Sequence, residues 1–428
     1  MNTPGATAFA TTTHRTENTM GIGLLRQPTT VLFGPGQRRQ LPQLVASVGE
    51  RVLMVTDARM AESPEFAVIT DALAARGVIV EVYAGTEPDL PRRNVTDITE
   101  RFGRDDRDGL DVIVGIGGGS CMDLAKVASV VLAHGGDVRD YYGEFLVPGP
   151  GCPVITVPTT GGTGAEVTCI SVIYDEDRGM KVGVASPHLE AYAAVIDPEL
   201  TLTCPAGLTA AAGADALSHL IESFTGRAKN PSADDIATKL YAGKNLLADT
   251  YARTGLALLN TSLPAVAARP DDLQARSDTL FGAYCAGMAI NTAGTAGAHA
   301  IQSPIGNLTH TPHGFGISAL LPYVMRYNLP TRVREFAEIG RILGVTDGMD
   351  PEQIQAQRAI ERIETILLTL GAPLDLRTLG LQPRHFGFVA EQSMLATRLT
   401  ANNPRELTVD AVHGILERGY DGDRSWWR

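Results

Sequence analysis

Residues 111–120 read Asp-Val-Ile-Val-Gly-Ile-Gly-Gly-Gly-Ser, a β-branched run that leads into three consecutive glycines. The run predicts a buried strand, and the residues from Ser120 onward predict a helix. Consecutive glycines let a ligand approach the backbone, and the start of a helix offers free N–H groups and a positive dipole end. The alternative is a plain tight turn, which does not need three glycines. The stretch predicts an α/β fold with a phosphate-binding loop at Gly117, Gly118, Gly119 and Ser120.

Similar strand and helix patterns alternate from Thr30 to Pro198. Strands are predicted at 30–34, 51–57, 78–84, 111–116, 153–158 and 193–197. The clearest helices between them are predicted at 64–76 and 120–134. Strands separated by helical segments indicate βαβ units and a parallel sheet, with any ligand beyond the carboxyl ends of the strands.

The glycine loop is not an ordinary dinucleotide-binding fingerprint, because the GxGxxG spacing is absent. In that fingerprint an acidic residue follows the glycines by about 20 residues and binds the ribose. Here the candidate acid, Asp57, precedes Gly117 by 60 residues. Asp57 at the end of a strand could equally be a helix N-cap or turn residue.

A second polar loop follows the strand predicted at 153–158. It reads Thr-Thr-Gly-Gly-Thr-Gly from Thr159 to Gly164. Hydroxyls and glycines at the same edge of the sheet suit hydrogen bonds to a cofactor's phosphate and nicotinamide ribose. A hydroxyl-rich loop alone is weak evidence, but its position after a strand matches that of the glycine loop.

The pattern changes after Pro198, where long segments with a 3.6-residue apolar period replace the short strands. The clearest of these segments lie at 333–345 and 351–370. The C-terminal half is therefore predicted to be mainly helical, with a boundary near residue 200.

Four residues of this half form a candidate metal site. Asp215 and His219 are four residues apart on a predicted helix, so both side chains lie on one face. His299 and His313 flank a segment rich in glycine and proline. One carboxylate and three imidazoles suit Fe(II) or Zn(II), whereas Ca and Mg prefer oxygen ligands. The alternative for Asp215 and His219 is a solvated helix stripe beside an apolar face.

Composition excludes several classes of protein. The 428 residues carry a net charge of -12, which argues against nucleic acid or an anionic membrane surface as a partner. No apolar run approaches the ~20 residues that a membrane-spanning helix needs. The five cysteines lack CxxC spacing and are predicted to be buried free thiols in a reducing cytoplasm. The first 25 or so residues lack the apolar core of a signal peptide and are predicted to be a disordered tail.

Taken together, the sequence resembles the iron-containing (group III) alcohol dehydrogenases over nearly its whole length, from about Thr29 to Glu417. The matching segments, in family order, are the strand-GGGS-helix at 111–126, PTTGGTGAEVT at 158–168, IDPELT at 196–201, GADALSHLIESF at 213–224 and HAIQSPIGNLTHTPHG at 299–314. Five co-linear motifs make the resemblance specific at family level.

The resemblance implies an N-terminal dinucleotide-binding domain with a parallel sheet and an all-helical C-terminal domain, the fold shared with dehydroquinate synthase. The expected divisions are a tail over 1–25, an NAD-binding domain over 26–200 and a metal-binding domain over 201–428. A small aldehyde or alcohol substrate, Fe2+ (or Zn2+) and a homodimer or higher homo-oligomer are also implied.

The family's site residues carry over by motif. The metal ligands are Asp215, His219, His299 and His313, and the pyrophosphate loop is Gly117, Gly118, Gly119 and Ser120. The nicotinamide-side residues are Thr159, Thr160, Thr163 and Lys181. The acid that favours NAD over NADP is Asp57, because a carboxylate repels a 2′-phosphate and accepts from a 2′-hydroxyl.

The chain departs from the family's pattern at its proton relay. Many members have a histidine where this chain has Ser303, and His310 stands where a small or polar residue is common. His310 is therefore a candidate proton shuttle, with a surface-loop residue as the alternative.

The expected activity is metal-dependent, NAD(H)-linked alcohol dehydrogenase or aldehyde reductase. The main alternative is a hydroxyacid-oxoacid transhydrogenase that keeps its nicotinamide bound, which Ser303 slightly favours. A lyase resembling dehydroquinate synthase fits the HAIQSPIG and TPHG motifs poorly. A non-enzymatic metal-binding protein is the remaining alternative.

Overall fold

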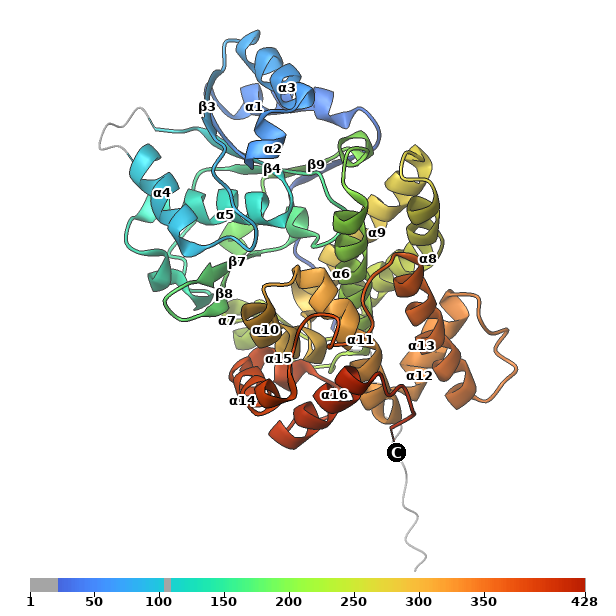
Figure 1. Cartoon of the computed structure of the whole chain (residues 1–428). Helices are drawn as coiled ribbons and strands as arrows, with labels where there is room; N and C mark the ends of the chain where they lie inside the picture. Colours follow the sequence, from blue (N-terminus) through green and yellow to red (C-terminus); the bar gives the residue numbers. More distant parts are fainter. Residues whose placement is uncertain (1–21, 104–108, 428) are drawn as a thin grey trace, which may run out of the picture.

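The computed structural model describes residues 22–103 and 109–427. Most of the predicted tail, residues 1–21, lies outside the described residues. A six-stranded parallel sheet organises the N-terminal half of the chain (Figure 1). In spatial order its strands are β1 (Thr30–Phe33), β9 (Ala193–Ile196), β6 (Val154–Pro158), β4 (Val112–Gly117), β2 (Arg51–Val55) and β3 (Ile79–Tyr83). The predicted parallel sheet is confirmed, with strand ends within two residues of those expected.

Side chains that alternate along the central strands build two separate cores. On β2, Leu53 and Val55 contribute to one core, while Val52 and Met54 contribute to the other. This follows from the two-residue period of a strand that is buried on both faces. Helices α4 (Arg92–Phe102) and α5 (Gly119–His134) cover the first face. The second is covered by α1 (Leu41–Val48) and α3 (Pro64–Ala74).

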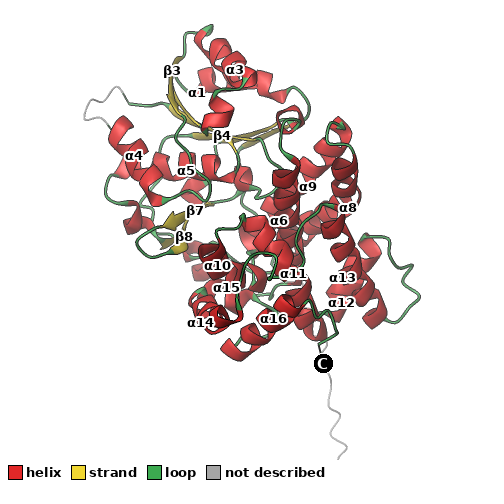
Figure 2. Cartoon of the chain, in the orientation of Figure 1, coloured by secondary structure: helices red, strands yellow, loops and turns green. Residues whose placement is uncertain are grey.

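A second, smaller sheet was not predicted. It consists of β5 (Gly143–Glu144), β8 (Met180–Ala185) and β7 (Ile170–Asp175), and β7 and β8 form an antiparallel pair. Its yellow strands lie beside α10 (Gly297–Thr309) of the C-terminal half (Figure 2). This sheet therefore lies between the large sheet and the helices.

The C-terminal half is helical, as predicted. Its remaining helices are α6 (Ala206–Thr225), α7 (Ala233–Thr238), α8 (Leu246–Ala268), α9 (Leu273–Ala293), α11 (His313–Asn328), α12 (Val333–Ile342), α13 (Glu352–Thr369), α14 (Phe386–Leu395), α15 (Thr397–Asn402) and α16 (Val409–Asp421). Helix α6 is almost wholly buried, and its apolar residues share one core with those of α8, α9 and α11. An element buried on all sides holds its polar side chains in fixed positions, which matters for Asp215 and His219.

The two halves also share apolar contacts. Val167, Ala194 and Ile196 of the N-terminal half form a buried cluster with Leu280 and Met288 of α9. All five cysteines are free, as predicted, and four of them are buried. Within the described residues, no helix combines the length and apolarity needed to cross a membrane.

Candidate active site

The glycine loop joins β4 to α5, and its glycines place no side chains at the start of that helix. Gly117 has a φ of 149°, and a Cβ there would lie 2.5 Å from Sγ of Cys121. A Cβ on Gly119 would lie 2.9 Å from the side chain of Thr163. Only glycine therefore fits at these two positions, and the turn leaves the first N–H groups of α5 open toward a ligand.

The threonine loop lies directly beside the glycine loop. Strands β4 and β6 pair in parallel with Gly117 opposite Pro158, so both loops leave the sheet at the same edge. The N–H of Thr159 donates to the carbonyl of Gly117 at 2.9 Å. A Cβ on Gly118 would lie 3.8 Å from Oγ1 of Thr160. Two polar loops far apart in sequence thus form one continuous wall.

Asp57 reaches the same wall from the end of β2, which neighbours β4. Its Oδ1 accepts from the N–H of Met60 at 2.8 Å and caps α2 (Ala58–Ala61). Its Oδ2 lies 3.9 Å from Sγ of Cys121, next to the glycine loop. The capping alternative considered from the sequence is therefore correct, and it leaves one carboxylate oxygen beside the loop.

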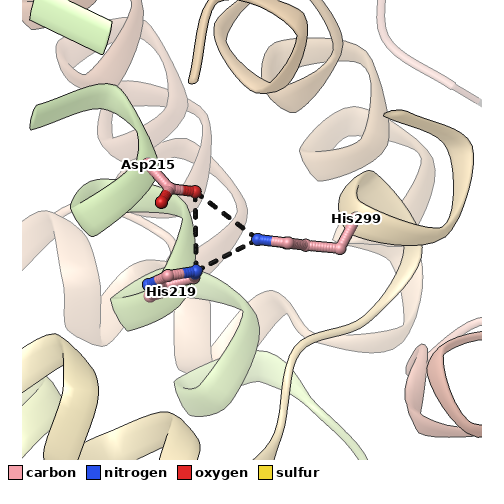
Figure 3. Close-up of side chains that lie close together, drawn as sticks. All are labelled: Asp215, His219 and His299. Carbon is pink, nitrogen blue, oxygen red and sulfur yellow. Dashed lines mark hydrogen bonds and ion pairs between the residues drawn. The ribbon is translucent and has the colours of Figure 1, made fainter. Parts of the chain in front are cut away.

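The four predicted metal ligands lie together, with three imidazole nitrogens around one carboxylate oxygen of Asp215. Asp215 and His219 lie one turn apart on α6, and His299 approaches from α10 (Figure 3). The Nε2 atoms of His219 and His299 are 3.1 Å apart, and each lies 3.5 Å from Oδ1 of Asp215. His313, the first residue of α11, also places Nε2 3.5 Å from that oxygen.

These separations fit a bound metal ion. Ligands about 2.0–2.1 Å from a tetrahedral ion lie about 3.4 Å from one another. The donor atoms of Asp215, His219 and His299 lie within 4.8 Å of one another, which is close enough for them to hold one metal ion. Oδ1 of Asp215 is buried and makes no hydrogen bond to any described residue. A buried carboxylate oxygen without a hydrogen bond is costly unless a ligand satisfies it.

Burial also sets the protonation of this cluster. It lowers the pKa of His219 to about 4 and that of His313 to about 3. Burial raises the pKa of Asp215, but His219, His313 and His299 outweigh it, and the net shift is downward. Burial also acts to lower the pKa of His299, but Glu222 and Asp215 outweigh it and raise that pKa to about 9. His219 and His313 are therefore neutral and ready to bind a metal, whereas Nε2 of His299 has to release its proton when a metal binds.

All of the predicted site residues except Gly117 and His310 line one cavity of about 1290 Å3. Its wall includes Asp57, Gly118, Gly119, Ser120, Thr159, Thr160, Thr163, Lys181, Asp215, His219, His299, Ser303 and His313. Lys181 extends from β8, and its Nζ lies 2.5 Å from Oδ1 of Asp89. The volume exceeds that of a drug-sized pocket, up to about 1,000 Å3, so a dinucleotide and a small substrate fit together.

Models of known families match both halves of the chain. The iron-containing alcohol dehydrogenase model matches residues 28–198, and the model of that family's C-terminal domain matches residues 209–420. The long-chain-alcohol dehydrogenase 1 of Geobacillus thermodenitrificans is 32% identical over 94% of this chain and 98% of its own length. The lactaldehyde reductase of Escherichia coli K12 is 31% identical over 90% of this chain and 96% of its own length.

This chain belongs to the iron-containing alcohol dehydrogenase family. A solved alcohol dehydrogenase from Oenococcus oeni agrees, with a TM-score of 0.85 and 29% identity over 93% of this chain and all of that one. Family membership makes the protein an oxidoreductase of the alcohol dehydrogenase type. The fold predicted from the resemblance is confirmed.

One further residue of the site in this alcohol dehydrogenase was not singled out from the sequence. Glu222 lies on α6, three residues after His219, and its Oε2 lies 2.6 Å from Nδ1 of His299. It also accepts from the N–H groups of Ala296 and Ala298, at 2.8 and 2.6 Å. The signal was available, because Asp215, His219 and Glu222 follow the helical period on one buried face.

The two candidates for proton transfer lie in different places. Ser303 lies one turn after His299 on α10 and lines the cavity. His310 is the exposed C-cap of α10, with a φ of 50°, and it is absent from the cavity wall. The chain turns at His310 before α11 begins, in line with the surface-loop alternative considered from the sequence, so this imidazole does not line the cavity.

Proposed function

We propose that the protein is a metal-dependent, NAD(H)-linked alcohol dehydrogenase that interconverts a small aldehyde and a primary alcohol. The observation that carries this proposal is the convergence of three imidazole nitrogens on Oδ1 of Asp215, in the cavity that the glycine loop borders. Hydride transfer requires a nicotinamide and a polarised carbonyl in close contact. One cavity that is lined both by the glycine and threonine loops and by the Asp215–histidine cluster meets that requirement.

The cofactor end of the cavity is proposed to bind NAD. The bare N–H groups of the glycine loop at Gly118–Ser120 suit the pyrophosphate, and the hydroxyls of Thr159, Thr160 and Thr163 suit the nicotinamide side. Oδ2 of Asp57, free of the capping bond that Oδ1 makes, suits a ribose 2′-hydroxyl. The same negative charge repels the 2′-phosphate of NADP.

The catalytic end is proposed to hold Fe(II), with Zn(II) as the alternative. Asp215, His219, His299 and His313 would be the ligands. A divalent ion bound there supplies Lewis-acid polarisation of the substrate oxygen. Glu222 fixes the ring of His299 by accepting from its Nδ1–H, which turns Nε2 toward Asp215.

Proton transfer is proposed to involve Ser303. Its hydroxyl lines the cavity one turn from His299 and can pass a proton along a hydrogen-bonded chain. An imidazole in this place would accept the proton itself, so the serine leaves that role to water or to the cofactor ribose.

Relatives that are 30–32% identical carry the names of enzymes for different substrates, including a long-chain-alcohol dehydrogenase, a methanol dehydrogenase and a sulfoacetaldehyde reductase. These names support an alcohol or aldehyde as the substrate and differ in the chain length and charge of that substrate.

The test is NADH oxidation with a panel of aldehydes, after chelation and after addition of Fe(II) or Zn(II). We expect activity to disappear on chelation and to return with the metal. Full activity of the metal-free protein would contradict the proposal. Aldehyde reduction that requires a second, reduced substrate such as a hydroxy acid as the hydride donor, with no exchange of free NADH, would instead indicate the transhydrogenase.

A further inference from the structure

Arg398 forms part of the cavity wall on the short helix α15. Its guanidinium carbon lies 4.1 Å from the ring centroid of Tyr241, which also lines the cavity. Its Nη1 lies 3.0 Å from the point where a Cβ on Gly294 would stand. Asn402, one turn later, donates to the carbonyls of Ala293 and Thr295 at 3.1 Å. These contacts hold α15 and Arg398 against the loop that precedes His299.

The guanidinium N–H groups of Arg398 are unpaired within the described part of the chain. Among the residues that the structure describes, its guanidinium makes no hydrogen bond and has no acidic group within 4 Å. Other arginines stacked on rings keep such partners. Arg405 stacks on Tyr327 and donates to its carbonyl at 2.9 Å, and Arg326 stacks on Trp426 and pairs with Glu364 at 2.6 Å.

A second basic residue, Lys229, lies outside the cavity wall and interacts electrostatically with Arg398. Lys229 lies beside Gly243, close to Tyr241, and the described residues include no ion pair for it. Burial lowers the pKa of Lys229, and the charge of Arg398 lowers it further. Glu144 raises the pKa of Lys229 in part, and its carboxylate accepts from the N–H of Leu240 at 2.8 Å. Lys229 therefore adds little charge to the cavity, and the unpaired guanidinium of Arg398 is the group in this part of the wall that suits an anion.

The same cavity connects Arg398 to the proposed catalytic end. Gly294, which Arg398 contacts, is five residues before His299. Five residues span at most about 18 Å even when fully extended. Because Arg398 and the histidines line the same cavity, a substrate that is bound at the histidines can extend along its wall toward Arg398. A planar guanidinium with its ring face stacked and its N–H edges free suits a carboxylate or a similar oxyanion.

We propose that Arg398 binds an anionic group on the substrate, so that the protein acts on aldehydes and alcohols that carry a carboxylate or a comparable oxyanion at the far end. This inference rests on the proposed function and names its substrate class.

The test compares ω-oxo carboxylates of four to six carbon atoms with alkanals of the same length, using metal-restored full-length enzyme and NADH. We expect kcat/KM to favour at least one carboxylate over its alkanal by about 10-fold or more, the scale of a hydrogen bond to a charged group. In Arg398→Gln that ratio should fall by about the same factor, and Arg398→Lys should keep part of it. Arg377→Gln is the matched control, because Arg377 stacks on Tyr420 outside the cavity.

A wild-type enzyme without this preference, or an equal ratio in Arg398→Gln, would overturn the inference. If neither kind of aldehyde is reduced, the proposed dehydrogenase function fails. Calorimetric binding of the matching ω-hydroxy carboxylates then decides the anion site separately. Binding that Arg398→Gln abolishes supports the site, and binding that is absent from the wild type or unchanged in the variant contradicts it.

Discussion

Oε2 of Glu222 lies 2.6 Å from Nδ1 of His299, on the side of the ring opposite to Asp215. The carboxylate is buried, and two backbone N–H groups at the start of α10 hold it in place. It therefore fixes both the orientation of a proposed metal ligand and the end of the helix that carries it. Partners of this kind orient metal ligands and raise their basicity.

Glu222→Gln should lower metal affinity by about 10- to 100-fold, the usual effect of losing such a partner. The amide keeps the shape of the side chain. Both carboxylate oxygens of Glu222 accept from N–H groups, so the NH2 group of the glutamine would face a donor in either orientation. Metal content after dialysis against a competing chelator measures the effect. Glu361→Gln, at an exposed position of α13, is the control. Wild-type metal retention in Glu222→Gln would show that Asp215 and the histidines need no such support.

Replacement of Asp57 should change cofactor preference. Asp57→Asn removes the charge but keeps an oxygen that can accept from the N–H of Met60 and cap α2. We expect the ratio of kcat/KM for NADPH to that for NADH to rise by about tenfold or more, because like charges in contact cost several kcal/mol. Asp57→Gly should show the same change together with a weaker helix. If the ratio is unchanged in both variants, Asp57 does not select the cofactor and acts only as the N-cap of α2.

Gly314→Ala should destabilise the protein and disturb the site. A Cβ on Gly314 would lie 1.9 Å from the carbonyl oxygen of Ala211 on α6, so α11 would have to move and carry His313 with it. Overpacking of this kind costs about 1–3 kcal/mol. Thermal unfolding and metal content measure the two effects.

The control for that substitution is Gly207→Ala on α6, where a Cβ would meet no atom within 4 Å. This variant should be as stable as the wild type or gain up to about 1 kcal/mol, because alanine restricts the unfolded chain. Equal stability of the two variants would contradict this prediction, because it would mean that α11 can move away from α6 at no cost in free energy.

Substitution of the two proton-transfer candidates should have opposite outcomes. His310→Asn retains a residue that tolerates the left-handed conformation, and its turnover should stay within about threefold of the wild type. Ser303→Ala should lower turnover by about tenfold or more, since it removes a hydroxyl that lines the cavity one turn after His299. Steady-state rates at saturating NADH and unchanged metal content distinguish these effects from unfolding. A large loss of turnover in His310→Asn but not in Ser303→Ala would indicate that His310 transfers the proton.

Much of the fold follows from local patterns in the sequence. The alternation along β2 predicts a strand buried on both faces, and the glycine run predicts the turn into α5. The four-residue spacing of Asp215 and His219 places both on one helix face, whatever that helix later contacts. These features depend on backbone period and steric freedom, which neighbouring residues determine.

Other features depended on how distant segments pack. Asp57 lies beside the glycine loop because β2 pairs with β4, although 60 residues separate it from Gly117. The role of Glu222 appeared only when α10 met α6, and His310 was excluded from the cavity by the turn that ends α10. Periodicity specifies which face of an element is buried, but the partner of that face is set by the packing of the whole chain.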